Sequence, residues 1–149
     1  MTDFEVGYLT AAIDGEGSIM LRLRKRYHSP RPAISVTSTN KQFLEYLASI
    51  VGNGNPCSHN SGNKRNPNWK KSWILAWESF PDCQKICELL QGKAIIKKQH
   101  VETMLEYIQI HKSYPGWHDT AHAPKGIIEK EYQLYHEMRR LNQKGVQHS

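Results

Sequence analysis

The chain has 149 residues, of which 38% are hydrophobic and 23% are charged, and its formal net charge at pH 7 is +6. These values fit one folded domain over residues 1–149 and exclude a disordered or collagen-like chain. No apolar run approaches the roughly 20 residues that a membrane-spanning helix needs, and the N-terminus lacks a secretory signal pattern. An odd number of cysteines without a C-x-x-C pair fits free thiols. We therefore expect a protein that is not secreted and has no membrane partner.

The basic residues are concentrated in one part of the chain. Residues 17–77 contain ten Lys and Arg residues but a single acid, Glu45, while acids outnumber bases in the remainder. Scattered surface lysines often do no more than improve solubility, but a long block with almost no acid favours a polyanionic partner.

The first predicted element is a helix from about Phe4 to Ile13. Asp3 stands at its N-cap position, and Gly15 and Gly17 are expected to end it. Gly7 and Ala11 are four residues apart, so the helix has a small face that permits close approach of another helix.

Two acids, Asp14 and Glu16, follow this helix one residue apart, and the next basic residue is Arg22. Core packing of a helix does not explain two acids without a nearby basic partner. Carboxylates at a helix end suit a divalent cation, so the sequence indicates a metal site beside a basic block, which is typical of phosphate chemistry.

Alternation from Met20 to Tyr27 predicts a strand with Leu21 and Leu23 on one face and three arginines, at 22, 24 and 26, on the other. The Ser29–Pro32 segment breaks this strand, and Ala33–Thr37 resumes it. A purely solvated arginine face would have acidic partners, and the sequence places none nearby.

The remaining elements are a helix over Lys41–Val51 capped by Asn40 or Thr39, a hairpin over Cys57–Ser79, and helices over Pro81–Gln91, Ala94–His111 and Lys125–Asn142. This order predicts an α+β fold in which helices cover one face of a four-stranded antiparallel sheet. The charged face would then be open to a ligand.

The stretch Leu9–Gly17 resembles the LAGLIDADG motif of homing endonucleases, with Thr10–Ala12 in place of AGL and Gly15–Glu16 in place of AD. The αββαββα order and the basic hairpin after the motif are similar to that family's core. The likeness covers about residues 4–110, and residues 111–149 form a helical extension.

The resemblance implies a site-specific, intron-encoded endonuclease that hydrolyses one phosphodiester per strand at a long pseudo-palindromic double-stranded DNA site. A single motif implies a homodimer whose motif helices pack at the two-fold axis. The cofactor would be Mg²⁺ or Mn²⁺, and Ca²⁺ would bind without supporting cleavage. The implied dimer interface comprises Gly7, Tyr8, Ala11, Ala12 and Asp14.

The resemblance also assigns the catalytic site. Glu16 takes the place of the metal-binding acid, with a backbone carbonyl of Gly15 or Gly17 beside it, and Asp14 has a structural role as a cap. The tandem Lys97–Lys98 resembles the family's basic residue at the scissile phosphate, and Lys98 is preferred. Ser38 and Lys41 fall near positions that surround the active-site waters.

The remaining predicted site residues read DNA from alternating strand positions. Arginines suit guanine edges and lysines suit phosphates, and serines add base contacts. The predicted set is Arg22, Arg24, Lys25, Arg26, Arg31, Ser35, His59, Lys64, Arg65, Lys70 and Ser72.

Two other functions stay open. One is a non-catalytic binder of the same fold, such as an RNA maturase-like splicing factor, and the other is an unrelated basic α+β module. Without a targeting segment, we expect an organelle (chloroplast or mitochondrion) or the prokaryotic cytoplasm.

Overall fold

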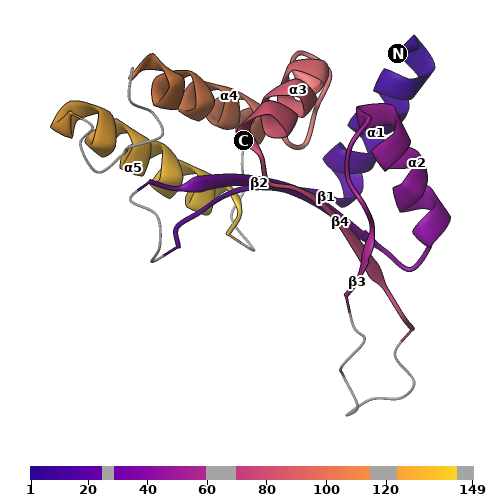
Figure 1. Ribbon diagram of the computed structural model, residues 1–149. Helices are drawn as coiled ribbons and strands as arrows, with labels where there is room; N and C mark the ends of the chain where they lie inside the picture. Colours follow the sequence, from indigo (N-terminus) through magenta and orange to yellow (C-terminus); the bar gives the residue numbers. More distant parts are fainter. Residues whose placement is uncertain (25–28, 60–69, 115–123, 144–149) are drawn as a thin grey trace.

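The computed structural model describes residues 1–24, 29–59, 70–114 and 124–143 (Figure 1). The elements in chain order are α1 (Asp3–Glu16), β1 (Gly17–Arg22), β2 (Arg31–Ser38), α2 (Lys41–Val51), β3 (Cys57–Ser58), β4 (Trp73–Trp77), α3 (Phe80–Leu90), α4 (Lys98–Ser113) and α5 (Lys125–Leu141). None of the described helices is long and apolar enough to cross a membrane.

The four strands form one antiparallel sheet in the order β1-β2-β4-β3. Helices α1 to α4 lie along one face of this curved sheet, and no described helix covers the opposite face (Figure 1). Helix α5 packs against α4 and against the edge strand β1. The predicted α+β architecture, with helices on one face of a four-stranded antiparallel sheet, is confirmed.

The core lies between the sheet and the helices. Ile19 of β1, Ile34 of β2 and Leu75 of β4 are fully buried and pack against Leu9 and Ile13 of α1. Alternation along each strand then directs the intervening residues to the open face. The fold thus leaves one sheet face available for a ligand.

Helix α1 differs from the prediction at both ends. Its N-cap is Thr2 rather than Asp3, because the side chain of Thr2 accepts from the backbone of Glu5 while Glu5 caps the backbone of Thr2 in return. The helix continues through Gly15 and ends at Gly17. A Cβ on Gly17 would lie 2.8 Å from the carbonyl oxygen of Ile13, so the turn into β1 requires glycine.

The first hairpin also differs from the prediction. Strand β1 ends at Arg22, and β2 begins at Arg31 and includes Pro32, which was expected to break it. Pro32 is tolerated because the pairing of β2 with β4 starts only at Ile34, so its missing N–H needs no partner strand on that side. Arg24 lies beyond the strand.

The later elements follow the prediction closely. Helix α2 has the predicted bounds, Asn40 caps it, and Gly52 ends it in the left-handed conformation at φ 85°. Helix α4 begins at Lys98, four residues after its predicted start. The tip of the second hairpin, with Lys64 and Arg65, lies outside the described residues, as do Lys25 and Arg26.

Candidate functional site

The side chain of Asp14 links the end of α1 to the backbone just before α4. Its carboxylate accepts hydrogen bonds from the backbone N–H groups of Ile95, Ile96 and Lys97 at 3.1, 3.2 and 2.8 Å. Burial of Asp14 raises the pKa of its carboxyl. The three backbone hydrogen bonds lower it, that from Lys97 most of all, and together they outweigh burial and hold the pKa below its usual value. Asp14 therefore has a structural role, but its partners are the turn residues just before α4 rather than its own helix.

Glu16 is the last residue of α1, and its side chain is exposed. In the described part of the chain, no hydrogen bond or short ion pair occupies its carboxylate. It stands at the negative end of the helix dipole, which favours a bound cation. Glu16 is thus free to bind a ligand, whereas Asp14 is not.

A surface pocket of about 520 Å³ brings Glu16 together with residues from two other segments. Ser38 ends β2 and Ser72 precedes β4, and both line this pocket with Glu16. Glu16 and Ser38 belong to the predicted catalytic set, and Ser72 belongs to the predicted DNA-contact set. Lys41 and Lys98, also predicted as catalytic, do not line the pocket, and the Nζ of Lys41 lies 3.8 Å from the carboxylate of Glu45.

The basic residue nearest these acids is Lys97 rather than the preferred Lys98. Lys97 Nζ donates to the carbonyl oxygen of Asp14 at 3.0 Å, while Lys98 is exposed on the first turn of α4. Burial holds the pKa of Lys97 below its usual value, and the charges of Asp14 and then Glu16 partly offset this effect. The lysine beside the acidic end of α1 is thus Lys97.

A divalent cation at Glu16 would need ligands besides the acidic, His and Cys side chains of the described residues. Among the described residues there is no group of three or more His, Cys, Asp or Glu side chains that could hold a metal. Mg²⁺ usually takes one or two carboxylates and completes its shell with waters and substrate phosphates. The carboxylate of Glu16 meets that requirement.

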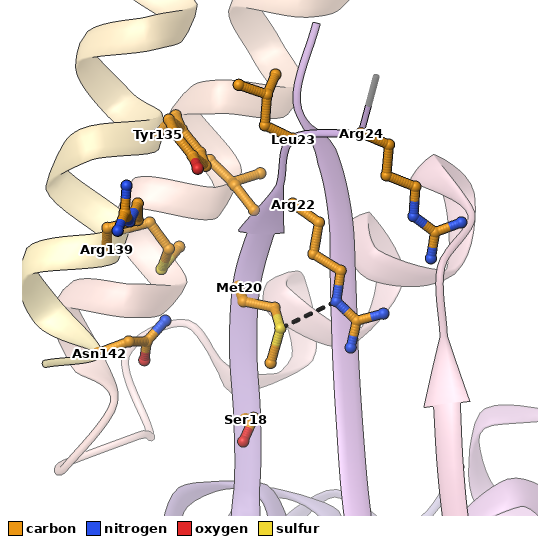
Figure 2. A pocket seen from close by; sticks show the side chains of 10 residues that line it. Ser18, Met20, Arg22, Leu23, Arg24, Tyr135, Arg139 and Asn142 are labelled. Atoms are coloured by element: carbon orange, nitrogen blue, oxygen red, sulfur yellow. Dashed lines mark hydrogen bonds between the residues drawn. The ribbon is translucent and has the colours of Figure 1, made fainter. Parts of the chain in front are cut away.

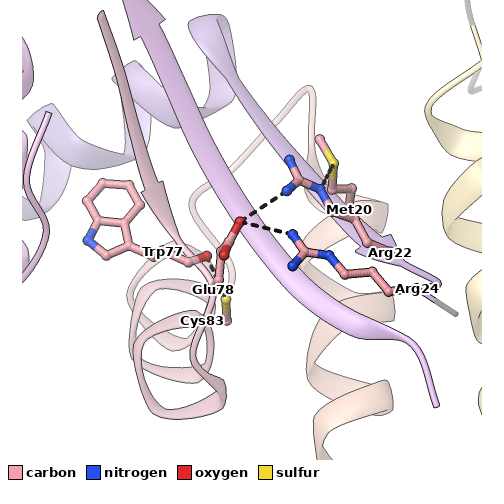
Figure 3. Close-up of polar contacts among 6 residues, drawn as sticks. All are labelled: Met20, Arg22, Arg24, Trp77, Glu78 and Cys83. Carbon is pink, nitrogen blue, oxygen red and sulfur yellow. Dashed lines mark hydrogen bonds and ion pairs between the residues drawn. The ribbon is translucent and has the colours of Figure 1, made fainter. Parts of the chain in front are cut away.

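The open face of the sheet carries a cluster of charged side chains (Figure 3). Glu78 Oε1 lies 3.0 Å from Arg22 Nη1 and 3.8 Å from Arg24 Nη2. The expectation that these arginines lack an acidic partner is therefore wrong. Glu78 directly follows β4, and the sheet register brings it within reach across β2, although it is distant in sequence.

The other predicted DNA-contact residues are not equally accessible. Ser35 and Ser72 are only 7% and 8% exposed, while His59 and Lys70 are exposed at the base of the second hairpin. The guanidinium of Arg31 lies 5.1 Å from the ring centroid of Phe80, so it stacks on α3. Only part of the predicted set thus faces solvent.

A groove of about 670 Å³ separates the edge strand β1 from α5 (Figure 2). Arg22 and Arg24 line its β1 side, and Tyr135 and Arg139 line its α5 side. The Arg139 guanidinium lies 5.8 Å from the ring centroid of Tyr135. Glu78 and Arg139 were missed in the sequence, where only the Arg139–Arg140 pair gave a signal. Lys97 was named there as one of a pair, but Lys98 was preferred.

The outer face of α1 is formed by small residues. Gly7, Ala11 and Gly15 are exposed at four-residue intervals, and a Cβ on either glycine would meet nothing within 4 Å. Ala12 differs from the prediction because it is buried in the chain's own core. Tyr8 packs edge-on against Tyr46 of α2. The face left open is therefore narrower than the predicted interface.

No protein-family model and no curated protein sequence matches the chain. Solved structures do match it. The archaeal intron-encoded homing endonuclease I-Vdi141I, complexed with DNA, has a TM-score of 0.72 at 20% identity over 99% of this chain and 89% of that chain. The homing endonuclease I-CvuI in complex with a DNA target has a TM-score of 0.72 at 16% identity over 98% and 86%.

A third match extends the comparison. The LAGLIDADG homing endonuclease I-GzeII, in complex with its DNA target, has a TM-score of 0.71 at 15% identity, and the likeness covers 96% of this chain but 46% of that chain. At these identities the likeness establishes the fold. The chain has the fold of the LAGLIDADG homing endonucleases, as the motif resemblance implied.

Proposed function

We propose that the chain is a site-specific DNA endonuclease that works as a homodimer with a divalent metal. The observation that carries this proposal is the position of a free carboxylate, Glu16, where α1 meets the open basic face of the sheet. The matched structures I-Vdi141I, I-CvuI and I-GzeII are complexes with DNA, which supports DNA as the partner. They do not favour the RNA maturase-like alternative.

Glu16 would hold Mg²⁺ or Mn²⁺ together with the backbone carbonyl of Gly15. The ion, when bound, would polarise the scissile phosphate and activate a water. Structures of I-CvuI are described with the I-CreI target in 2 mM Mg, where the DNA is not cleaved, and with its own target in 2 mM Ca, which supports a divalent cation. Lys97 would place its ammonium beside the charge that develops on the phosphate.

The proposed homodimer rests on the carboxylate of Glu16, the acid that the end of α1 brings to the pocket. One chain supplies one metal-binding acid, and cutting both strands of a duplex requires two. The face of Gly7, Ala11 and Gly15 would let the α1 helices of two protomers approach closely and bring the two Glu16 side chains together. The open sheet faces of the two protomers would then lie on the two halves of a pseudo-palindromic site.

The test compares the wild type with Glu16→Gln on a randomised library of duplex DNA sites, with and without Mg²⁺. We expect the wild type to cut selected sites only with metal, and the variant to bind the same sites but cut at least about 100-fold more slowly. Glu106→Gln is the matched control, because Glu106 is an exposed glutamate on α4.

Three results would contradict the proposal. The wild type could leave every site intact, Glu16→Gln could cut as fast as Glu106→Gln, or the protein could bind structured RNA tightly and duplex DNA weakly. The dimer is tested separately by light scattering, in which a monomer at micromolar concentration, both free and on its DNA site, would exclude the shared arrangement.

A further inference from the structure

Glu78 is an acid in the middle of the basic face, where it lowers the positive charge available to DNA. We propose that Glu78 is a specificity-determining residue that holds Arg22 and Arg24 for reading base edges and disfavours their binding to phosphates. This inference rests on the proposed DNA-cleaving function and names a residue that sets its target preference.

The guanidinium of Arg22 is held on two sides (Figure 3). Its Nη1 donates to Glu78 Oε1 at 3.0 Å, and its Nε donates to Met20 Sδ at 3.1 Å. Met20 lies on β1, the strand of Arg22 itself, and Glu78 follows β4 on the other side of β2. The side chain of Arg22 is therefore held both from its own strand and from across β2. Of the five N–H groups of an arginine, most remain available for a ligand.

Stability alone does not account for this cluster. The side chains of Arg22, Arg24 and Glu78 are 35%, 53% and 50% exposed, and exposed ion pairs contribute little to folding. Binding gains more from such a pair. An arginine already held in one orientation loses less side-chain entropy when it meets a ligand, and bidentate contact with guanine needs the planar fork in one orientation.

The charge of Glu78 affects the two kinds of DNA contact differently. Phosphate contacts are sequence-independent and depend on net positive charge, so a carboxylate beside two arginines weakens them. Base edges are neutral, so the same carboxylate affects contact with them much less. Because specificity is a difference between two affinities, Glu78 would raise the preference for the right sequence while lowering the affinity for DNA in general.

The experiment measures binding of the full chain to a randomised duplex library and to one unrelated duplex over a range of salt concentrations. It uses Glu78→Gln, which keeps the shape but removes the charge, and Glu78→Asp, which keeps the charge but shortens the reach. Glu129→Gln is the matched control, because Glu129 is an exposed glutamate in an ion pair with Lys125 on α5.

We expect Glu78→Gln to bind unrelated DNA on the order of tenfold more tightly, with a steeper salt dependence, and to lose base preference at one or two positions per half-site. Glu78→Asp should lose the same base preference without the steeper salt dependence. Glu129→Gln should keep the wild-type base preference.

Unchanged base preference in both Glu78 variants would overturn the inference, and so would equal effects of Glu78→Gln and Glu129→Gln. In either case the wild type would still select its site, so the proposed endonuclease would stand. A wild type that selects no DNA site would overturn both proposals at once.

Discussion

Acids meet basic residues at two places in this molecule, and the two places are built differently. At the end of α1, the carboxylate of Asp14 is bound by three backbone N–H groups, and Lys97 donates to its backbone carbonyl. On the open sheet face, the carboxylate of Glu78 pairs with side chains, those of Arg22 and Arg24. Asp14 is partly buried, whereas the Glu78 cluster is exposed to solvent.

The difference in donors suits the two acidic residues to different roles. Backbone donors are fixed by the fold, so the first contact sets the distance between two helices and positions the neighbouring Glu16. On an exposed surface, the arginine N–H groups that Glu78 leaves unused can meet a ligand, so the second contact can orient the arginines for recognition. We therefore expect substitutions near Asp14 to alter stability and cleavage, and substitutions near Glu78 to alter the choice of target.

The largest expected effect distinguishes the two adjacent lysines. Lys97→Met should lower kcat about 100-fold or more, because the ammonium beside Asp14 and Glu16 is lost, whereas Lys98→Met should change kcat little. Single-turnover cleavage of the selected site measures both, and thermal unfolding checks that both variants fold. If Lys98→Met lost more activity than Lys97→Met, Lys98 would be the lysine that acts at the scissile phosphate. Contact with Asp14 and Glu16 would then not identify the lysine needed for cleavage.

The next effect concerns Asp14 itself. Asp14→Asn should lower the free energy of unfolding by about 1–2 kcal/mol, because three backbone N–H groups lose a charged acceptor. The pKa of Asp14 is lowered in the folded chain, so its contribution is complete above the unfolded pKa of about 4 and disappears as the pH falls through the folded pKa.

The wild type should therefore keep its full advantage over Asp14→Asn at neutral pH and lose it progressively as the pH falls below about 4. Urea unfolding at several pH values measures this difference, and Glu106→Gln on the exposed face of α4 serves as the control. If the free energies of unfolding of the wild type and Asp14→Asn differ by the same amount down to about pH 3, the charge of the Asp14 carboxylate does not contribute to stability.

Local signals predicted the fold well where an element carries its own boundaries. Helix α2 has Asn40 at one end and Gly52 at the other, and both ends were predicted correctly. The cap of α1 was also readable, since Thr2 and Glu5 have the spacing of a capping box, but Asp3 was chosen instead.

Contacts between distant segments could not be predicted in the same way. Helix α4 begins at Lys98 because Asp14, some eighty residues earlier, binds the backbone before it. Which of two adjacent lysines faces the site depends on that contact. Likewise, Glu78 reaches Arg22 only through the register of three strands. The motif resemblance therefore singled out Glu16 and the Lys97–Lys98 pair, but which of the two lysines lies beside Asp14 required the structure.

The smallest expected effect tests whether the basic face extends beyond the sheet. Arg139 of α5 lines the groove opposite Arg22 and Arg24 (Figure 2), and we expect it to bind a phosphate. Arg139→Ala should weaken DNA binding a few-fold and reduce the salt slope by about 1, without changing base preference. Arg140→Ala is the matched control, because Arg140 is paired with Glu137 at 2.7 Å. Equal, small losses in both variants would confine recognition to the sheet, whereas altered base preference in Arg139→Ala would mean that α5 reads sequence as the strands do.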